Sequence, residues 1–83
     1  MGGYVYLLSN IKNDWHYIGS TKDLKQRIEK HQKGTVKSTK FQRPLKLIYY
    51  EAYSNYSLAK KREYQLKNHN QSKELLYKQL GIL

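Results

Sequence analysis

The stretch GYVYLLSNIKNDWHYIGS, which runs from Gly3 to Ser20, decides the fold of this protein. Its two ends, residues 3–10 and 15–20, are rich in β-branched and aromatic residues, which favour strands. The polar residues IKND at 11–14 separate these ends, so the stretch predicts a β-hairpin. Each strand places a tyrosine beside a β-branched residue, and tyrosines in strands usually serve packing alone.

A helix is predicted directly after the hairpin, over residues 21–33. Ser20 is the expected N-cap, and Asp23 three residues later completes a capping box. Gly34 supplies a natural C-terminal stop. The segment 35–44 has no clear hydrophobic period and predicts a basic loop.

One more strand and two more helices complete the predicted elements. Residues 45–53 predict a third strand, and their continuous apolar middle suggests burial on both faces. Residues 56–67 predict a helix, 68–71 a break, and 72–80 a short last helix that Gly81 ends. The last helix is expected to direct three leucines toward the core: Leu75, Leu76 and Leu80.

The length of 83 residues allows one domain, expected to span residues 1–83. The element order ββαβαα predicts an α+β fold in which helices pack against a small sheet. The absence of cysteine excludes disulfides and thiolate metal sites. No apolar run approaches the roughly 18–20 residues of a membrane span, and the N-terminus does not resemble a signal peptide. We therefore expect a soluble, cytoplasmic protein with no membrane partner.

Positive charge dominates the composition, because 16 Lys and Arg residues against 6 Asp and Glu residues give a formal net charge of +10. Between Ser20 and Lys46, nine basic residues oppose only two acidic ones. Such a segment attracts polyanions, most commonly nucleic acid, although a solubilising lysine surface is the alternative. Four residues are candidates for contacts with the phosphate backbone: Lys22, Lys37, Lys40 and Arg43.

Two polar residues interrupt the apolar arc of the first helix. Leu24 and Ile28, four residues apart, define the arc that faces the core. Arg27 and His31 have the same spacing and lie beside that arc. Burying such groups without partners is unfavourable, so they are either functional or structural. In the structural alternative, Arg27 extends to solvent and His31 is hydrogen-bonded.

The second helix carries one carboxylate at the edge of its apolar arc. Leu58, Ala59 and Leu66 define the arc, and Glu63 lies beside it among four basic residues of the same helix. A carboxylate in this position is either an internal salt-bridge partner or an oxygen ligand for a hard divalent cation.

Five of these residues supply the parts that phosphodiester hydrolysis requires. A carboxylate-held metal ion can lower the pKa of a bound water, and an arginine can grip phosphate oxygens. Tyrosine hydroxyls can bind phosphate or relay a proton, although a free tyrosine is a poor base at neutral pH. The chain contains no Ser–His–Asp arrangement, P-loop or zinc ligand set. The candidate set is Tyr6, Tyr17, Arg27, His31 and Glu63.

The chain resembles the GIY-YIG nuclease domain from Tyr4 to about Lys67. The triplet YVY at 4–6 stands where that family has GIY, and YIG at 17–19 matches its second triplet. GSTKDLKQRIEKH carries the family's helix, and AKKREYQLK carries its glutamate. The run RPLKLIYYE resembles in particular a small stand-alone bacterial subfamily. The order and spacing of these motifs, rather than any one triplet, carry the resemblance.

The resemblance implies a three-stranded antiparallel sheet flanked by helices and a one-metal cut of nucleic acid. Tyr6 would activate the water as base or relay, and His31 would position or exchange a proton near it. Tyr17 and Arg27 would hold the scissile phosphate. Glu63 would ligate Mg²⁺ or Mn²⁺.

Further implications concern Gly19 and the substrate. Gly19 would allow a close approach of backbone at the site. DNA is expected as substrate in preference to RNA, in repair, recombination or mobile-element processes. The larger relatives attach a separate DNA-binding domain. We expect none here, so the basic segment or a protein partner is expected to dock the substrate. Relatives also carry an asparagine on a later helix, for which Asn68 and Asn70 come too early.

Three functions remain open from the sequence. The first is a metal-dependent DNA endonuclease, which the complete candidate set favours. The second is a non-catalytic nucleic-acid-binding module with the same fold, which the missing asparagine favours. The third is a basic structural or interaction protein in which the pattern is accidental.

Overall fold

A computed structural model describes residues 2–10, 12 and 14–82. Part of the predicted turn at 11–14, namely residues 11 and 13, lies outside the described residues, as do residues 1 and 83 of the predicted domain. The elements are β1 (Gly3–Asn10), β2 (Trp15–Thr21), α1 (Leu24–Lys33), the 3₁₀ turn η1 (Lys40–Gln42), β3 (Lys46–Tyr53), α2 (Tyr56–Asn68) and α3 (Asn70–Leu80).

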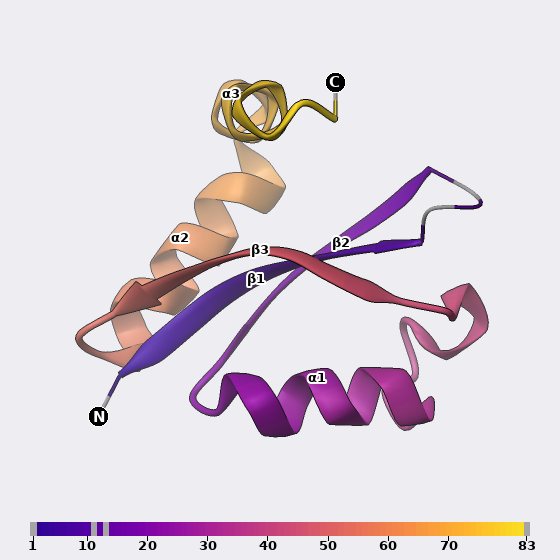
Figure 1. Cartoon of the computed structure of the whole chain (residues 1–83). Coiled ribbons are helices and arrows are strands. Elements are labelled where there is room, and N and C mark those ends of the chain that lie inside the picture. Colours follow the sequence, from indigo (N-terminus) through magenta and orange to yellow (C-terminus); the bar gives the residue numbers. More distant parts are fainter. Residues whose placement is uncertain (1, 11, 13, 83) are drawn as a thin grey trace.

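The three strands form an antiparallel sheet in the order β2–β1–β3, which confirms the predicted α+β class and element order. Figure 1 shows α1 below this sheet and α2 and α3 above it. Tyr6 in the central strand lies opposite Gly19 on one neighbour and Tyr50 on the other. The sheet therefore presents one face to α1 and the other to α2 and α3.

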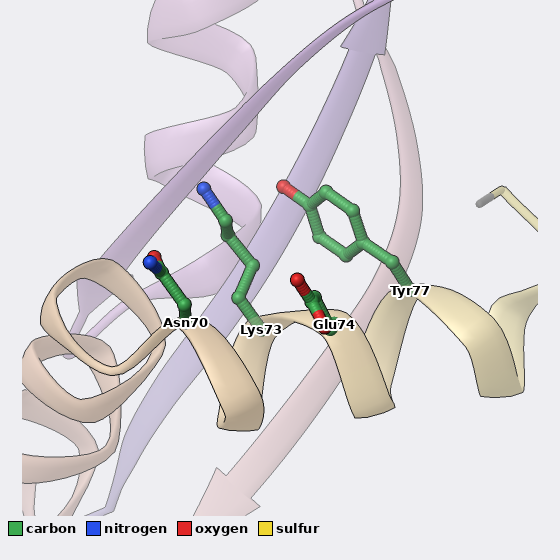
Figure 2. Close-up of a pocket in the computed structure, with 4 residues that line it drawn as sticks. All are labelled: Asn70, Lys73, Glu74 and Tyr77. Atoms are coloured by element: carbon green, nitrogen blue, oxygen red, sulfur yellow. The ribbon is translucent and has the colours of Figure 1, made fainter.

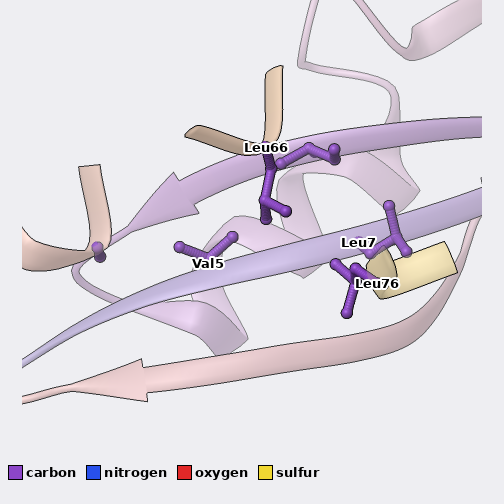
Figure 3. Packing of buried hydrophobic residues seen from close by; sticks show 6 residues of the cluster. Val5, Leu7, Leu66 and Leu76 are labelled. Carbon is purple, nitrogen blue, oxygen red and sulfur yellow. The ribbon is translucent and has the colours of Figure 1, made fainter. Parts of the chain in front are cut away.

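Two apolar clusters form because successive side chains of β1 point to opposite faces. Val5 and Leu7 pack on the α2–α3 side with Leu66 and Leu76, as Figure 3 shows. Tyr6 and its neighbours form the second cluster on the α1 side, together with Leu8, Leu45, Trp15, Tyr17, Leu24, Ile28 and Leu47. The central strand is thus buried on both faces, and the two helical layers share it.

The third strand corrects one prediction. Burial on both faces was expected for residues 45–53, but β3 is an edge strand and Tyr50 is 53% exposed. Its apolar run is explained by a bulge in β3, where Ile48 is the extra residue opposite the step from Leu7 to Leu8 of β1, so that Ile48 and Tyr49 both pack on the α2–α3 side. The continuous apolar run of β3 thus results from its bulge and its partial burial. The strand that is buried on both faces is β1.

Polar contacts tie β3 to α2. The Glu51 carboxylate accepts hydrogen bonds from Arg62 at 3.0 Å and from the hydroxyls of Tyr49 and Tyr53. Burial by itself would raise the pKa of Glu51, but these hydrogen bonds outweigh burial and hold the pKa below its ordinary value. These hydrogen bonds give Tyr49 and Tyr53 a structural role on the edge strand, so neither residue needs a role in a binding site.

The helix boundaries differ from the predicted ones at two N-termini. Asp23, not Ser20, is the N-cap of α1, and its carboxylate accepts from Gln26 N at 3.0 Å. The Ser20 hydroxyl instead donates to Glu63, because β2 continues to Thr21 before the chain turns. The last helix begins at residue 70 instead of 72, so the predicted break at 68–71 is reduced to one residue.

Two leucines also lie elsewhere than predicted. Leu76 is buried and Leu80 packs against the core, but Leu75 is 61% exposed. Leu58 is 43% exposed, whereas Ala59 on the same helix is fully buried. In both α2 and α3, the buried face of the helix is therefore narrower than the set of apolar residues in its sequence. Among the described residues, no helix combines the length and the apolar character that crossing a membrane requires.

The contrast between Leu66 and Leu75 gives a direct test of the core. Leu66→Ala removes a side chain that is 1% exposed, and we expect it to lower the free energy of unfolding by about 2–5 kcal/mol. Leu75→Ala is the matched control and should change it by about 0.5 kcal/mol or less. Chemical denaturation followed by circular dichroism measures both, and equal losses would contradict the assignment of the core.

Candidate active site

The Tyr6 hydroxyl is the centre of a buried polar cluster between β1 and α1. Its oxygen lies 2.8 Å from Nε2 of His31 and 3.4 Å from Nε of Arg27. Both partners come from α1, one turn apart, and their position beside the apolar arc places them under the sheet. His31 has no exposed surface and Tyr6 is 1% exposed. The structure therefore brings together three of the predicted residues.

A hydrogen-bond chain fixes where the protons lie. Arg27 can only donate, so the buried hydroxyl proton of Tyr6 goes to Nε2 of His31. Nδ1 of His31 then carries the ring proton and donates to Oγ1 of Thr39, 2.7 Å away. The Thr39 hydroxyl in turn reaches the carbonyl oxygen of Val36 at 3.5 Å. His31 is thus held as the neutral tautomer that accepts from Tyr6.

The electrostatics of the cluster agree with this assignment. Burial raises the pKa of Tyr6 to about 12, against the lowering effect of its hydrogen bond to Arg27. Burial and, after it, the positive charge of Arg27 lower the pKa of His31 to about 4. The hydrogen bond to Tyr6 raises the pKa of Arg27, against the effect of burial. At neutral pH the site therefore holds a neutral tyrosine, a neutral histidine and one cation.

The second strand supplies the wall of the cluster. A Cβ atom on Gly19 would lie 2.5 Å from Cζ of Tyr6, so only glycine leaves room for that ring. The Tyr17 ring lies beside the cluster, with centroids 6.4 Å from Tyr6 and 5.4 Å from His31. The Tyr6 side chain therefore packs closely against Gly19, and the role of Gly19 in a site stays a prediction.

Glu63 reaches the same strand from the other face of the sheet. Its Oε1 accepts from the Ser20 hydroxyl, and its Oε2 pairs with Nζ of Lys67 at 2.7 Å. Lys67 also lies 5.5 Å from the centroid of the Tyr17 ring. Because consecutive residues of β2 face opposite ways, Gly19 meets Tyr6 while Ser20 meets Glu63. The carboxylate and the tyrosine cluster thus flank one edge strand.

A hollow of about 330 Å³ opens beside this edge. We name it the arginine hollow; its lining residues are Ser20, Thr21, Lys22, Arg27 and Tyr56. Another hollow, of about 430 Å³, lies beside α3. Its lining residues are Asn70, Lys73, Glu74 and Tyr77, which Figure 2 shows. That hollow has one lysine and one glutamate and no residue of the cluster. Of these two hollows, the arginine hollow, with two cations and no carboxylate in its lining, is the better suited to an anion.

The four residues predicted to contact phosphates lie at the two opposite ends of α1. Lys22 lines the arginine hollow, before the first turn of α1. The other three follow the last turn of this helix, about 15 Å further along for a helix of ten residues. Lys40 lies over the Phe41 ring at 4.9 Å, and Arg43 donates to the carbonyl oxygen of Lys40. Lys37 is exposed in the same segment.

Sequence reasoning missed Thr39, Ser20 and Lys67. Thr39 sits in the loop after α1, where no periodic pattern marks it, and only the fold shows that it is buried against His31. Ser20 was interpreted as a cap. Lys67 could have been found, because a lysine four residues after Glu63 is the spacing of an intrahelical ion pair. Within residues 2–10, 12 and 14–82, no group of three or more His, Cys, Asp or Glu residues could hold a metal ion, so Glu63 is not part of such a group.

Comparisons with known proteins point to one family. The family model described as GIY-YIG catalytic domain matches residues 2–76. A UPF0213 protein of Staphylococcus aureus strain Mu3 is 45% identical over 60 residues, which cover 71% of this chain and 73% of the relative. UPF0213 protein SAV0488 of strain Mu50 and SA0446 of strain N315 give the same values. No solved structure matches the chain.

Thr39→Val tests the hydrogen-bond chain. Valine keeps the shape of threonine but leaves Nδ1 of His31 without an acceptor, and we expect a loss of about 1–3 kcal/mol in the free energy of unfolding. Thr39→Ser retains the hydroxyl and should recover most of the loss. Nitrogen NMR of the imidazole should show the Nδ1–H tautomer in the wild type. A Nε2–H tautomer would contradict the assignment.

The pKa of His31 predicts how stability depends on pH. Because its pKa is about 4 in the folded protein and about 6.5 when unfolded, the unfolded chain binds the extra proton between these values. The contribution of His31 is complete above about pH 6.5 and declines as the pH falls toward 4. Between pH 7 and pH 5 we expect a loss of about 2 kcal/mol.

Denaturant unfolding at pH 7, 6 and 5 measures this loss, over a range in which most carboxylates remain ionised. His69→Gln replaces an exposed histidine and should keep the wild-type slope. Stability that is independent of pH across this range would show that His31 is not buried as a neutral base.

Proposed function

Since the chain belongs to the GIY-YIG catalytic-domain family, a family of nucleases, we propose that it is a divalent-metal-dependent endonuclease that hydrolyses phosphodiester bonds in DNA, with residues 1–83 acting as one domain. The observation that carries the proposal is the Tyr6–His31–Arg27 cluster, which lies across β2 from Glu63. The bacterial relatives and a DNA substrate favour action in the cytoplasm.

Tyr6 and His31 form the proton path of the proposed reaction. The attacking water gives its proton to the Tyr6 oxygen as the tyrosine passes its own proton to Nε2 of His31. The 2.8 Å contact supports this transfer, and a pKa of about 12 favours a relay over a preformed tyrosinate. The new P–O bond forms as the bond to the leaving oxygen breaks. Thr39 acts only as a positioning residue, because it touches His31 and not the substrate.

Arg27 and Tyr17 hold the phosphate in this proposal. Arg27 lines the arginine hollow and stays charged, so it can donate to the non-bridging oxygens as their charge develops. The Tyr17 ring lies beside Tyr6 and His31, which would bring its hydroxyl to the same phosphate. Lys22 lines the hollow with Arg27 and adds a second cation.

Glu63 is the proposed ligand for Mg²⁺ or Mn²⁺. Mg²⁺ in phosphoryl-transfer sites commonly uses one or two carboxylates together with substrate oxygens and waters, so a half-buried carboxylate beside an anion site fits it. When bound, the ion would supply Lewis-acid stabilisation of the leaving oxygen. Lys67 must then release Oε2, while the Ser20 hydroxyl can keep its hold on Oε1.

A second candidate is a non-catalytic nucleic-acid-binding module. The ion pair with Lys67 favours it, because an ammonium group already neutralises the proposed metal ligand. Such a module would bind DNA with a steep dependence on salt and leave it uncut with either metal ion.

Cleavage of supercoiled, branched and single-stranded DNA with Mg²⁺ or Mn²⁺ tests the proposal. We expect Tyr6→Phe to lower the rate by about 10²–10⁴-fold, because it removes the relay and keeps the ring. Arg27→Ala should lower it by about 10²–10³-fold, and Glu63→Ala should abolish metal-stimulated cleavage.

Lys78→Ala is the matched control, since it removes an exposed cation of α3 that lies outside the cluster and the predicted phosphate contacts, and it should leave most activity. Cleavage that survives all three site substitutions would overturn the assignment. Binding without cleavage in the wild type would establish the second candidate instead.

A further inference from the structure

A second hollow adjoins the arginine hollow on the α1 side of the sheet. We name it the tyrosine hollow; it measures about 400 Å³, and its lining residues are Tyr4, Lys22, Asp23, Leu24, Lys25 and Tyr50. This volume falls within the roughly 300–1,000 Å³ of ligand pockets. Lys22 lines both hollows, so a chain whose phosphate lies against Arg27 would continue directly into the tyrosine hollow.

Two tyrosine rings in the tyrosine hollow lie outside the buried clusters of the core. Tyr4 and Tyr50 lie on neighbouring strands, with ring centroids 6.2 Å apart and planes at 63°. Both point to the face that carries Tyr6, but Tyr50 is 53% exposed and neither belongs to the buried clusters. In Figure 1, the N-terminal end of β1 reaches beyond the first turn of α1, so the helix leaves this end of the sheet uncovered.

Two lysines, Lys22 and Lys25, line the tyrosine hollow together with these rings. At the adjoining arginine hollow, Nζ of both Lys22 and Lys60 lies within 5.6 Å of the centroid of the Tyr56 ring. The opposing charge is Asp23, whose carboxylate accepts from Gln26 N as the cap of α1. Exposed aromatic faces among lysines suit a polyanion whose units also carry flat rings, which is the chemistry of a nucleic acid strand.

We propose that the tyrosine hollow binds one unpaired nucleobase, that of the nucleotide next to the phosphate held by Arg27. A base stacks on a tyrosine only where its own face is free, and in a duplex the neighbouring base pairs cover both faces. The preferred substrate is therefore a single strand or a locally opened duplex. This inference deepens the proposed function, since it places the base relative to the proposed cleavage site.

Binding without divalent metal tests the subsite separately from cleavage. Fluorescence anisotropy compares a labelled single-stranded oligonucleotide with the duplex of the same sequence at fixed salt. We expect tighter binding of the single strand by the wild type. Tyr50→Ala should weaken single-strand binding by between about 5-fold and 150-fold, the range for loss of one stacked base, and should change duplex binding little.

Two control variants separate stacking from other effects. Tyr50→Phe keeps the aromatic face and should bind like the wild type. Tyr64→Ala removes another exposed tyrosine, on α2, and should also leave binding unchanged. A 2-aminopurine placed in the single strand should show Tyr50-dependent quenching on binding. Circular dichroism checks that Tyr50→Ala is folded, which we expect because Tyr50 lies outside the buried clusters.

The outcomes distinguish the two proposals. Tyr50-dependent binding of single strands by a protein that cuts nothing would support the subsite and overturn the nuclease proposal. Metal-dependent cleavage with equal binding of single strand and duplex, unchanged in Tyr50→Ala, would overturn the subsite and leave the nuclease proposal standing. Loss of duplex and single-strand binding by the same factor would also overturn the subsite, because it would indicate a contact with the backbone alone.

Discussion

The hydroxyl of Tyr6 has to find a hydrogen-bond acceptor inside the protein, and several other features of the structure follow from this need. His31 supplies the acceptor, and it can do so only as the tautomer that Thr39 holds from the other side. Thr39 in turn fixes the loop after α1 against the helix. The proximity of the Tyr6 ring excludes a side chain at Gly19. The buried hydroxyl of Tyr6 thus constrains which residues can occupy three positions: one in a helix, one in a loop and one in a neighbouring strand.

The central strand serves packing and chemistry at the same time because its side chains alternate between two faces. Val5 and Leu7 complete the core under α2 and α3, while Tyr6 between them points to α1. The proposed catalytic hydroxyl is therefore held by the strand with the most extensive pairing in the sheet. Such placement limits the motion of the oxygen, as a group that transfers protons over a fixed distance requires.

Local patterns in the sequence were sufficient for the hairpin, the element order and the unusual position of Arg27 and His31. They failed where the outcome depends on partners far along the chain. Ser20 has the sequence context of a helix cap, and its bond to Glu63, 43 residues away, becomes visible only in the fold. Thr39 carries no local signal for the same reason. The apolar run of β3 was misjudged because hydrophobicity alone cannot tell a bulged edge strand from a central one.

The alternation along β2 has a consequence for which changes in length the chain can accept. Gly19 and Ser20 are consecutive, yet one contacts the tyrosine cluster and the other contacts Glu63. A change of one residue in β2 before Gly19 would shift the register of the rest of the strand. A deletion would place the hydroxymethyl group of Ser20 against Tyr6 in place of the glycine hydrogen, and an insertion would place the side chain of Ile18 there. The connection that precedes β2 is free of this constraint, since loops tolerate added residues. We therefore expect natural variants to keep the register of β2 and to vary more in the length of the connection before it.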